Sequence, residues 1–203
     1  MTIDQIMRSA PVIPVLVLEG DADWAELARI FVEAGLPVLE VTLRTPAALD
    51  AIRKMGSVPG AIVGSGTVLN EAQLEEALEA GSQFIVSPGL TEPLAKAVIR
   101  SGVPYLPGVA TAADIMRGLD LGLDRFKFFP AEASGGIPAL KALSAPFRQA
   151  RFCPTGGIRP ETAADWLAVP SVLCVGCSWL YRPADKTFAA VSERASQARE
   201  LRS

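Results

Sequence analysis

The sequence predicts an α/β protein with a single domain, residues 1–203, folded as a (β/α)₈ barrel. Short apolar runs alternate with Ala/Leu/Glu-rich stretches of helical length along the whole chain, which implies right-handed βαβ units and a parallel sheet. The runs are nearly continuous in apolar residues, as is typical of strands buried on both faces. Eight such units, with no linker between them, fit a barrel of small size. An open, doubly wound sheet is the alternative.

Each strand is expected where an apolar run meets a polar or glycine turn. The expected strands are residues 14–17, 38–42, 61–64, 84–87, 105–107, 126–129, 151–155 and 172–176. The expected helices are residues 23–34, 46–54, 71–80, 92–100, 112–118, 161–168 and about 185–201, with a further one near 138–143.

Residues at the helix boundaries support these assignments. Asp23 and Asn70 can cap the helices that follow them, because their side chains accept hydrogen bonds from the first backbone amides. Gly35, Gly81 and Gly102 each follow a helical stretch, where a C-terminal glycine is expected.

Composition excludes several classes of partner. The net charge is −3 and the basic residues form no run, so no nucleic-acid footprint is present. The first ten residues carry Asp4 and Arg8 and lack the apolar core of a signal peptide, and the apolar stretch 11–18 is too short to span a bilayer. We expect a cytoplasmic protein without membrane contact.

The three cysteines are Cys153, Cys174 and Cys177, and the last two form a C-x-x-C pair. This spacing is compatible with a redox pair or half of a zinc site. A zinc site needs further ligands, and the chain has only one other cysteine and no histidine. We interpret the cysteines as small buried side chains.

Lys127 is the most informative residue. It lies inside the expected strand FKFF at 126–129, whereas the other lysines lie in helices or loops. Burial favours the uncharged amine, which attacks carbonyl carbon. Without histidine, acid–base chemistry falls to carboxylates, lysine, tyrosine or cysteine. The sequence therefore indicates Schiff-base chemistry; a structural ion pair, for example with Glu40, is the alternative.

Other polar residues follow the C-terminal ends of the expected strands, where a barrel carries its active site. Glu40 suits proton transfer or pairing with Lys127. Arg44 offers a planar fork for a carboxylate or phosphate, or is a surface arginine, and Thr67 adds a hydroxyl. The glycines before Thr67 begin a dinucleotide fingerprint, but Leu69 occupies its third glycine position, which excludes NAD.

The ends of the last two expected strands indicate a phosphate site. Thr155, Gly156 and Gly157 precede a helix, and Gly176 and Ser178 follow the next strand. Glycine turns allow close approach of backbone amides to an anion, and barrels often bind phosphate at this place. Two ordinary glycine turns are the alternative.

Five segments together resemble the bacterial 2-keto-3-deoxy-6-phosphogluconate (KDPG) aldolases and 4-hydroxy-2-oxoglutarate aldolases. They are LEVTLRT at 39–45, GSGTVLN at 64–70, VSPGL at 86–90, FKFFPAE at 126–132 and FCPTGGI at 152–158. The resemblance runs in register from about residue 11 to 180, and the first segment is more similar to the gluconate-type than to the galactonate-type enzyme.

The resemblance implies a class I aldolase, an aldehyde-lyase of the Entner–Doudoroff pathway, which needs neither metal nor cofactor and is usually a homotrimer. It implies a phosphorylated 2-keto acid as substrate, pyruvate as product, and often cleavage of 4-hydroxy-2-oxoglutarate. The implied roles are Schiff-base lysine for Lys127, acid–base for Glu40, carboxylate binding for Arg44 and Thr67, phosphate binding for Gly156, Gly157 and Ser178, stereochemical choice for Thr155, and pocket wall for Pro88 and Phe129.

One position departs from the family. Cys177 stands where a second glycine is common, and its side chain either crowds the phosphate amides or points into the wall. A phosphosugar isomerase and a non-catalytic phosphosugar-binding protein would share such a site, and a structural trimeric barrel of the same fold is a third alternative. An isomerase has no need of a strand lysine, and a binding protein would tolerate its loss.

Overall fold

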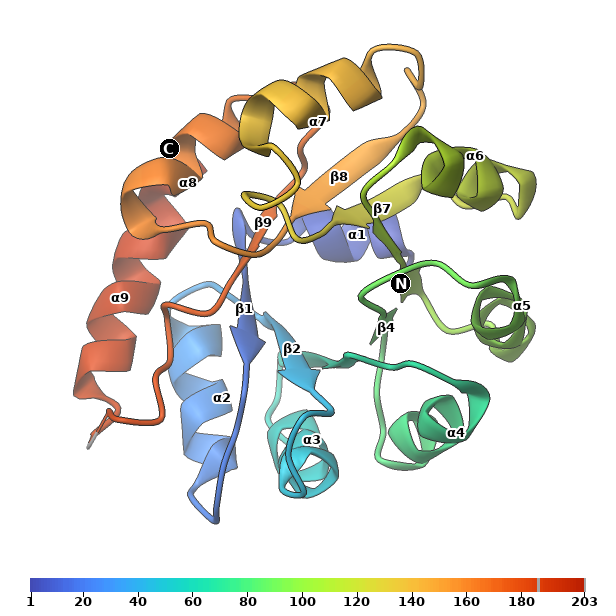
Figure 1. Ribbon diagram of the computed structural model, residues 1–203. Helices are drawn as coiled ribbons and strands as arrows, with labels where there is room; N and C mark the ends of the chain where they lie inside the picture. Colours follow the sequence, from blue (N-terminus) through green and yellow to red (C-terminus); the bar gives the residue numbers. More distant parts are fainter. Residues whose placement is uncertain (186, 203) are drawn as a thin grey trace.

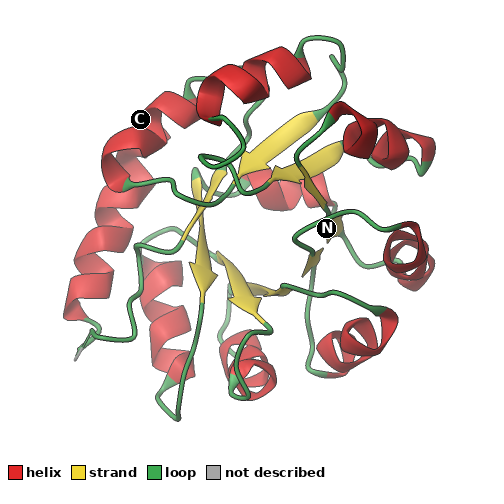
Figure 2. Ribbon diagram, viewed as in Figure 1, coloured by secondary structure: helices red, strands yellow, loops and turns green. Residues whose placement is uncertain are grey.

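A computed structural model describes residues 1–185 and 187–202, and its parallel strands form a curled sheet with most of the helices around the outside and the first one behind the curl (Figures 1 and 2). The strands are β1 Val12–Leu16, β2 Val38–Thr42, β3 Ile62–Gly66, β4 Ile85–Val86, β5 Tyr105–Leu106, β6 Gly108–Val109, β7 Arg125–Phe128, β8 Arg151–Pro154 and β9 Val175–Cys177. The helices are α1 Ile3–Arg8, α2 Trp24–Glu33, α3 Ala48–Gly56, α4 Glu71–Glu79, α5 Glu92–Ser101, α6 Ala112–Asp120, α7 Gly136–Ser144, α8 Pro160–Leu167, α9 Ala189–Arg199 and a short 3₁₀ turn, η1 Glu200–Arg202.

The strands pair in parallel in two groups. One has the order β5-β4-β3-β2-β1-β9 and the other β6-β7-β8. Isolated parallel bridges, Phe152 with Val172 and Thr155 with Gly176, link β8 to the segment that contains β9. The order follows the chain without the reversal that a doubly wound sheet requires, so that alternative is wrong.

The expected strand at 105–107 is instead two short strands separated by Pro107. Proline has no N–H to donate to a sheet ladder, and its ring fixes φ. β5 pairs with β4, whereas β6 pairs with β7. The carbonyl of Pro107 still accepts a hydrogen bond from the amide of Lys127 at 2.8 Å. Pro107 therefore lies where the chain passes from one group of strands to the other.

Helix α1 was not expected. Thr2 caps it in a capping box with Gln5, a signal that the sequence contains. Its apolar side chains Ile6 and Met7 are buried in a cluster with Ile13, Val38, Phe84, Val86, Leu106 and Cys153. Arg125 Nε donates to Asp4 Oδ1 at 2.6 Å, which ties α1 to the start of β7. Burial of two residues in so short a helix is a tertiary effect.

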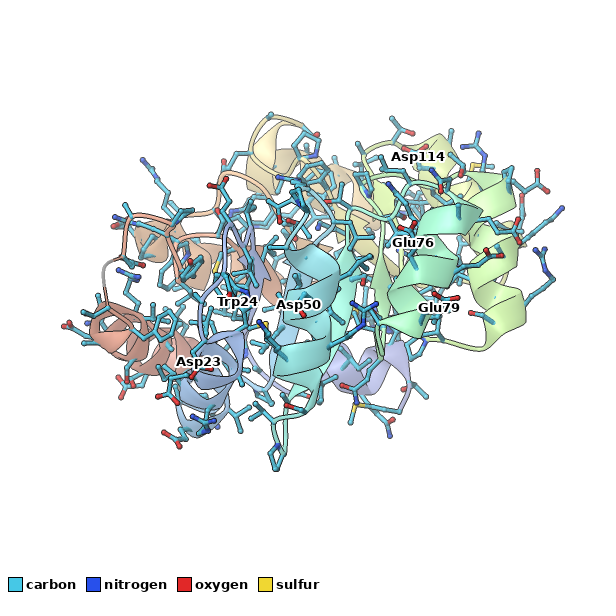
Figure 3. All side chains as sticks on the ribbon, turned by 90° about the horizontal axis from the view of Figure 1, so that it is seen from below. Asp23, Trp24, Asp50, Glu76, Glu79 and Asp114 are labelled. Carbon is cyan, nitrogen blue, oxygen red and sulfur yellow. The ribbon has the colours of Figure 1, made fainter. Side chains whose placement is uncertain are left out.

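The other helices are amphipathic, and their apolar faces pack on the sheet. Trp24, Leu27 and Phe31 of α2 belong to the large cluster between sheet and helices. The outer faces are acidic at several places, as Figure 3 shows for Asp50, Glu76 and Glu79. None of the helices in the described residues is long and apolar enough to cross a membrane.

The C-terminal helix is shorter than expected. α9 begins at Ala189 instead of about residue 185, and Lys186, within the expected span, lies outside the described residues. Helix α7 is longer than its expected span 138–143, because it begins at Gly136 after a left-handed glycine. The remaining helices match within two residues at each end.

Candidate active site

Lys127 and Glu40 form a buried ion pair inside the curl. Lys127 lies on β7 and Glu40 on β2, two strands that belong to different groups. Nζ of Lys127 is 2.8 Å from Oε1 of Glu40, and the side chains are only 7% and 3% exposed. A buried charge pair is costly to desolvate unless its geometry is good. The two residues that the sequence singled out therefore meet in space.

A cavity of about 110 Å³ opens beside this pair. Arg44, Lys127, Phe129, Thr155, Gly156, Gly157, Gly176, Cys177 and Ser178 line it, together with the apolar residues Val15, Val17 and Ile158. The Lys127 ammonium lies 5.4 Å from the centre of the Phe129 ring, within cation–π range. Apolar walls with a few convergent polar groups are typical of small-molecule sites.

Arg44 and Thr67 contact each other at this end of the sheet. Arg44 Nε donates to Thr67 Oγ1 at 3.2 Å, which leaves other guanidinium N–H groups for a ligand. Thr67 has φ of +60°, in the left-handed region that β-branched residues rarely adopt. Such backbone strain is concentrated at functional sites.

The glycine turn after β8 lies against the segment that follows β7. Gly156 and Gly157 have φ of +101° and +81°, which only glycine adopts easily. The amide of Ala131 donates to the Thr155 carbonyl at 2.8 Å, and the amide of Glu132 donates to the Gly156 carbonyl at 3.1 Å. These bonds fix the shape of a turn whose glycines line the cavity.

Cys177 points into the wall. Its side chain is 3% exposed and belongs to the cluster between sheet and helices. Burial raises the pKa of the Cys177 thiol, so it stays protonated at neutral pH. Cys153 and Cys174 are also buried, which confirms the interpretation of all three as small core side chains.

Pro88 is not among the residues that line this cavity. It borders a separate surface hollow of about 180 Å³ with Val68, Leu69, Ser87, Gly89, Thr91 and Leu94. The hydroxyl of Ser87 lies 2.7 Å from that of Tyr105 and donates to the Gly89 carbonyl. These hydrogen bonds fix the turn that contains Pro88. The structure brings nine of the ten expected site residues to one end of the sheet around Lys127, and Pro88 lines its neighbouring hollow.

Two further contacts at the site were not expected from the sequence. Trp166 Nε1 of α8 donates to Glu132 Oε1 at 3.0 Å, which joins α8 to the segment that supports the glycine turn. Gly176 lies against Thr155, because a Cβ built on it would be 2.3 Å from Thr155 Oγ1. Glu132 stands at the end of a segment that carries the resemblance, and Thr155 and Gly176 follow the two strands expected to form the phosphate site, but the sequence did not indicate either contact itself.

The family model for KDPG and KHG aldolase matches residues 3–192. The chain belongs to the KDPG and KHG aldolase family. The KHG/KDPG aldolase of Escherichia coli is 53% identical over 192 residues, which cover 94% of this chain and 90% of that protein.

Two solved structures of KDPG aldolases are similar to this one. The enzyme of Zymomonas mobilis with 3-phosphoglycerate has a TM-score of 0.95 and 56% identity, over 98% of this chain and 95% of that chain. The enzyme of Legionella pneumophila, with pyruvate captured as a covalent carbinolamine intermediate, has a TM-score of 0.87 and 40% identity, over 99% and 96% of the two chains. The family and the α/β fold with a curled parallel sheet therefore agree with the expectation from the sequence.

Proposed function

We propose that this member of the KDPG and KHG aldolase family is a class I aldolase. It cleaves 2-dehydro-3-deoxy-6-phosphogluconate to pyruvate and D-glyceraldehyde 3-phosphate in the Entner–Doudoroff pathway. The observation that carries the proposal is the buried pair of Lys127 and Glu40, 2.8 Å apart, beside a cavity that glycine turns line on one side. The covalent pyruvate adduct captured in the Legionella pneumophila relative supports an imine route.

The pair supplies a nucleophile through one proton transfer. Movement of a proton from Lys127 Nζ to Glu40 Oε1 gives a neutral amine and a carboxylic acid. The amine attacks the keto carbon of the substrate and forms a carbinolamine. Glu40 then donates its proton to the departing hydroxyl, water leaves, and an iminium ion on Lys127 results.

Cleavage uses the iminium as the electron acceptor. The Glu40 carboxylate removes the proton from the hydroxyl at carbon 4, and the electrons of that O–H bond form the aldehyde. The bond between carbons 3 and 4 breaks, and its electron pair forms an enamine. Glyceraldehyde 3-phosphate leaves, Glu40 returns the proton to carbon 3, and water hydrolyses the imine to release pyruvate and free Lys127.

The other residues bind the two ends of the substrate in this proposal. Arg44 and Thr67 hold the carboxylate beside the keto carbon, since the guanidinium has unused donors. Gly156, Gly157 and Ser178 bind the phosphate in this proposal. The Zymomonas mobilis relative, solved with 3-phosphoglycerate, supports binding of a phosphorylated acid by the family. Thr155 and Phe129 border the carbon chain of the substrate between these ends, and Thr155 influences the stereochemistry. Pro88 borders the separate hollow and is proposed as a more distant part of the pocket wall.

A second substrate, 4-hydroxy-2-oxoglutarate, is part of the proposal. The name of the Escherichia coli relative includes this activity. The substrate has a carboxylate in place of the phosphorylated end, and its cleavage to pyruvate and glyoxylate uses the same bonds. We expect it to depend on Lys127 and Glu40 but little on the phosphate turn.

We also infer that the two groups of strands close into one (β/α)₈ barrel that forms a single domain. The bridges between β8 and the β9 segment on one side, and the passage from β5 to β6 through Pro107 on the other, support this closure. A homotrimer in the cytoplasm stays a prediction from the sequence, and light scattering of the purified protein tests the trimer.

The deciding experiment is borohydride reduction with pyruvate, followed by peptide mass mapping. We expect a pyruvyl adduct on Lys127 alone. The Lys127→Met protein should form no adduct. Lys96, an exposed lysine on α5, gives the matched control, because Lys96→Met should label like the wild type. A folded wild-type protein that gains no adduct would remove the aldolase proposal.

A further inference from the structure

The backbone conformation at Gly66 does not require a glycine. It ends β3 beside Thr42 of β2, in regular parallel register. It is absent from the described glycines with positive φ, so an L-residue could adopt its conformation. Glycine within a strand is less stable than alanine by about 0.5–1 kcal/mol. The reason for glycine must therefore lie in the space above its α-carbon.

Glu40 occupies that space. A Cβ built on Gly66 would lie 2.2 Å from Glu40 Oε1, 2.7 Å from Cγ and 2.8 Å from Cδ. These separations are well below van der Waals contact. The same Oε1 accepts the hydrogen bond from Lys127 Nζ at 2.8 Å. The carboxylate thus lies between the bare α-carbon of Gly66 and the ammonium.

We propose that Gly66 is the positioning residue for the Glu40 carboxylate. Any side chain at position 66 forces Oε1 to move by about 1 Å, and such a displacement of a proton-transfer group costs on the order of 100-fold in rate. Glu40 is almost fully buried, which leaves few alternative rotamers for its carboxylate. The effect on turnover rests on the proposed aldolase function, whereas the contact itself does not.

Gly64, two residues earlier on β3, provides the matched control. A Cβ there would lie 2.5 Å from the Phe84 ring, a clash of comparable severity with a core aromatic side chain. The three atoms nearest to that Cβ all belong to Phe84, so the clash that Gly64→Ala creates is with this ring, although Gly64 also pairs with Glu40 in the strand register. If Gly66 were only a packing residue, the two substitutions would behave alike.

The test is a double-substitution cycle with Glu40→Gln, in which turnover and borohydride trapping of pyruvate are measured. We expect Gly66→Ala to lower kcat by about 100-fold in the wild type, with little change in KM, and by less than about threefold in the Glu40→Gln protein. Gly64→Ala should have the same relative effect in both backgrounds. Equal losses from Gly66→Ala in both backgrounds, or a fully active Gly66→Ala protein, would overturn the proposal.

A second cycle measures thermal stability and keeps the proposal testable if Gly66→Ala folds poorly. Glu40→Ala removes all three atoms that the new methyl group would meet. We expect Gly66→Ala to lower Tm in the wild type and to leave Tm unchanged or slightly raised in the Glu40→Ala protein, where alanine no longer meets the carboxylate. The same loss of Tm in both would contradict the inference. Failure of the aldolase function alone would appear as a wild type that traps no pyruvate, with this stability cycle unaffected.

Discussion

Lys127 and Glu40 meet inside the curl although 87 residues separate them in the chain and they lie on strands of different groups. Among the described residues, each is the only ion-pair partner of the other, and both side chains are buried. Removal of one partner leaves the other as an unpaired buried charge, which typically costs 3–5 kcal/mol. The pair is therefore expected to contribute both to the reaction and to the stability of the fold.

Lys127→Met should abolish turnover and lower the free energy of unfolding by about 3–5 kcal/mol, because Glu40 is left without a partner. Urea unfolding and steady-state kinetics measure the two effects. Adding Glu40→Gln should restore most of the stability and none of the activity. Substantial activity in Lys127→Met would show that the lysine is only structural.

Glu40→Gln should lower kcat by at least about 100-fold with little change in KM, because the amide keeps the shape but cannot take a proton. Kinetics with both substrates check this, since both cleavages need the same proton transfer. An increase confined to KM would make Glu40 a binding residue instead.

Gly176→Ala should change the handling of the substrate hydroxyl. The new methyl group would lie 2.3 Å from Thr155 Oγ1 and 3.0 Å from its Cγ2, so the Thr155 side chain must move. We expect a loss of selectivity between aldehyde-derived stereoisomers in the condensation direction, measured by product analysis, with pyruvate trapping on Lys127 retained. Unchanged selectivity would show that Thr155 does not control the stereochemistry.

Cys177→Gly should leave the KM for the phosphorylated substrate within about twofold of the wild-type value, because the side chain points into the wall. The substitution removes a buried side chain and adds backbone freedom, so we expect a destabilisation of about 1–3 kcal/mol. Cys177→Ala is the control, because it removes the thiol without the added backbone freedom of glycine. A clear fall in KM for the phosphorylated substrate alone would mean that the thiol crowds the phosphate.

Asp4 should contribute stability that depends on pH. The hydrogen bond from Arg8, with a further one from Arg125, holds the pKa of Asp4 below its ordinary value of 3.8. The stabilisation is therefore present above that value and is lost as pH falls through the lower pKa of the folded state. Asp4→Asn should cost at most about 1 kcal/mol at neutral pH, since the side chain is one-third exposed, and nothing at strongly acidic pH.

Denaturant unfolding between pH 2 and pH 7 measures this difference. The exposed Asp120 of α6 serves as the control, because it forms no ion pair in the described part of the chain. Asp120→Asn should follow the wild-type curve at every pH. A difference between wild type and Asp4→Asn that persists at the lowest pH would assign the effect to packing of α1.

The sequence by itself determined the alternation of strands and helices, and most of their boundaries, because continuous apolar runs and helix caps are local signals. Residues 38–42 and 71–80 are clear examples, since one reads as a buried strand and the other as a capped helix. It also marked Lys127, because a lysine within an apolar strand is costly whatever its partner. The resemblance supplied the roles that single residues could not.

Only the tertiary structure decided which residues meet. α1 is too short to be stable alone, and the burial of Ile6 and Met7 against other strands accounts for it. The break at Pro107 depends on two different neighbouring strands. The close approach of Gly66 to Glu40, and of Gly176 to Thr155, joins adjacent strands whose register no local pattern contains. Contacts of this kind depend on how side chains fill a packed interior. Which side chains meet there is decided by the fold, not by the neighbouring sequence.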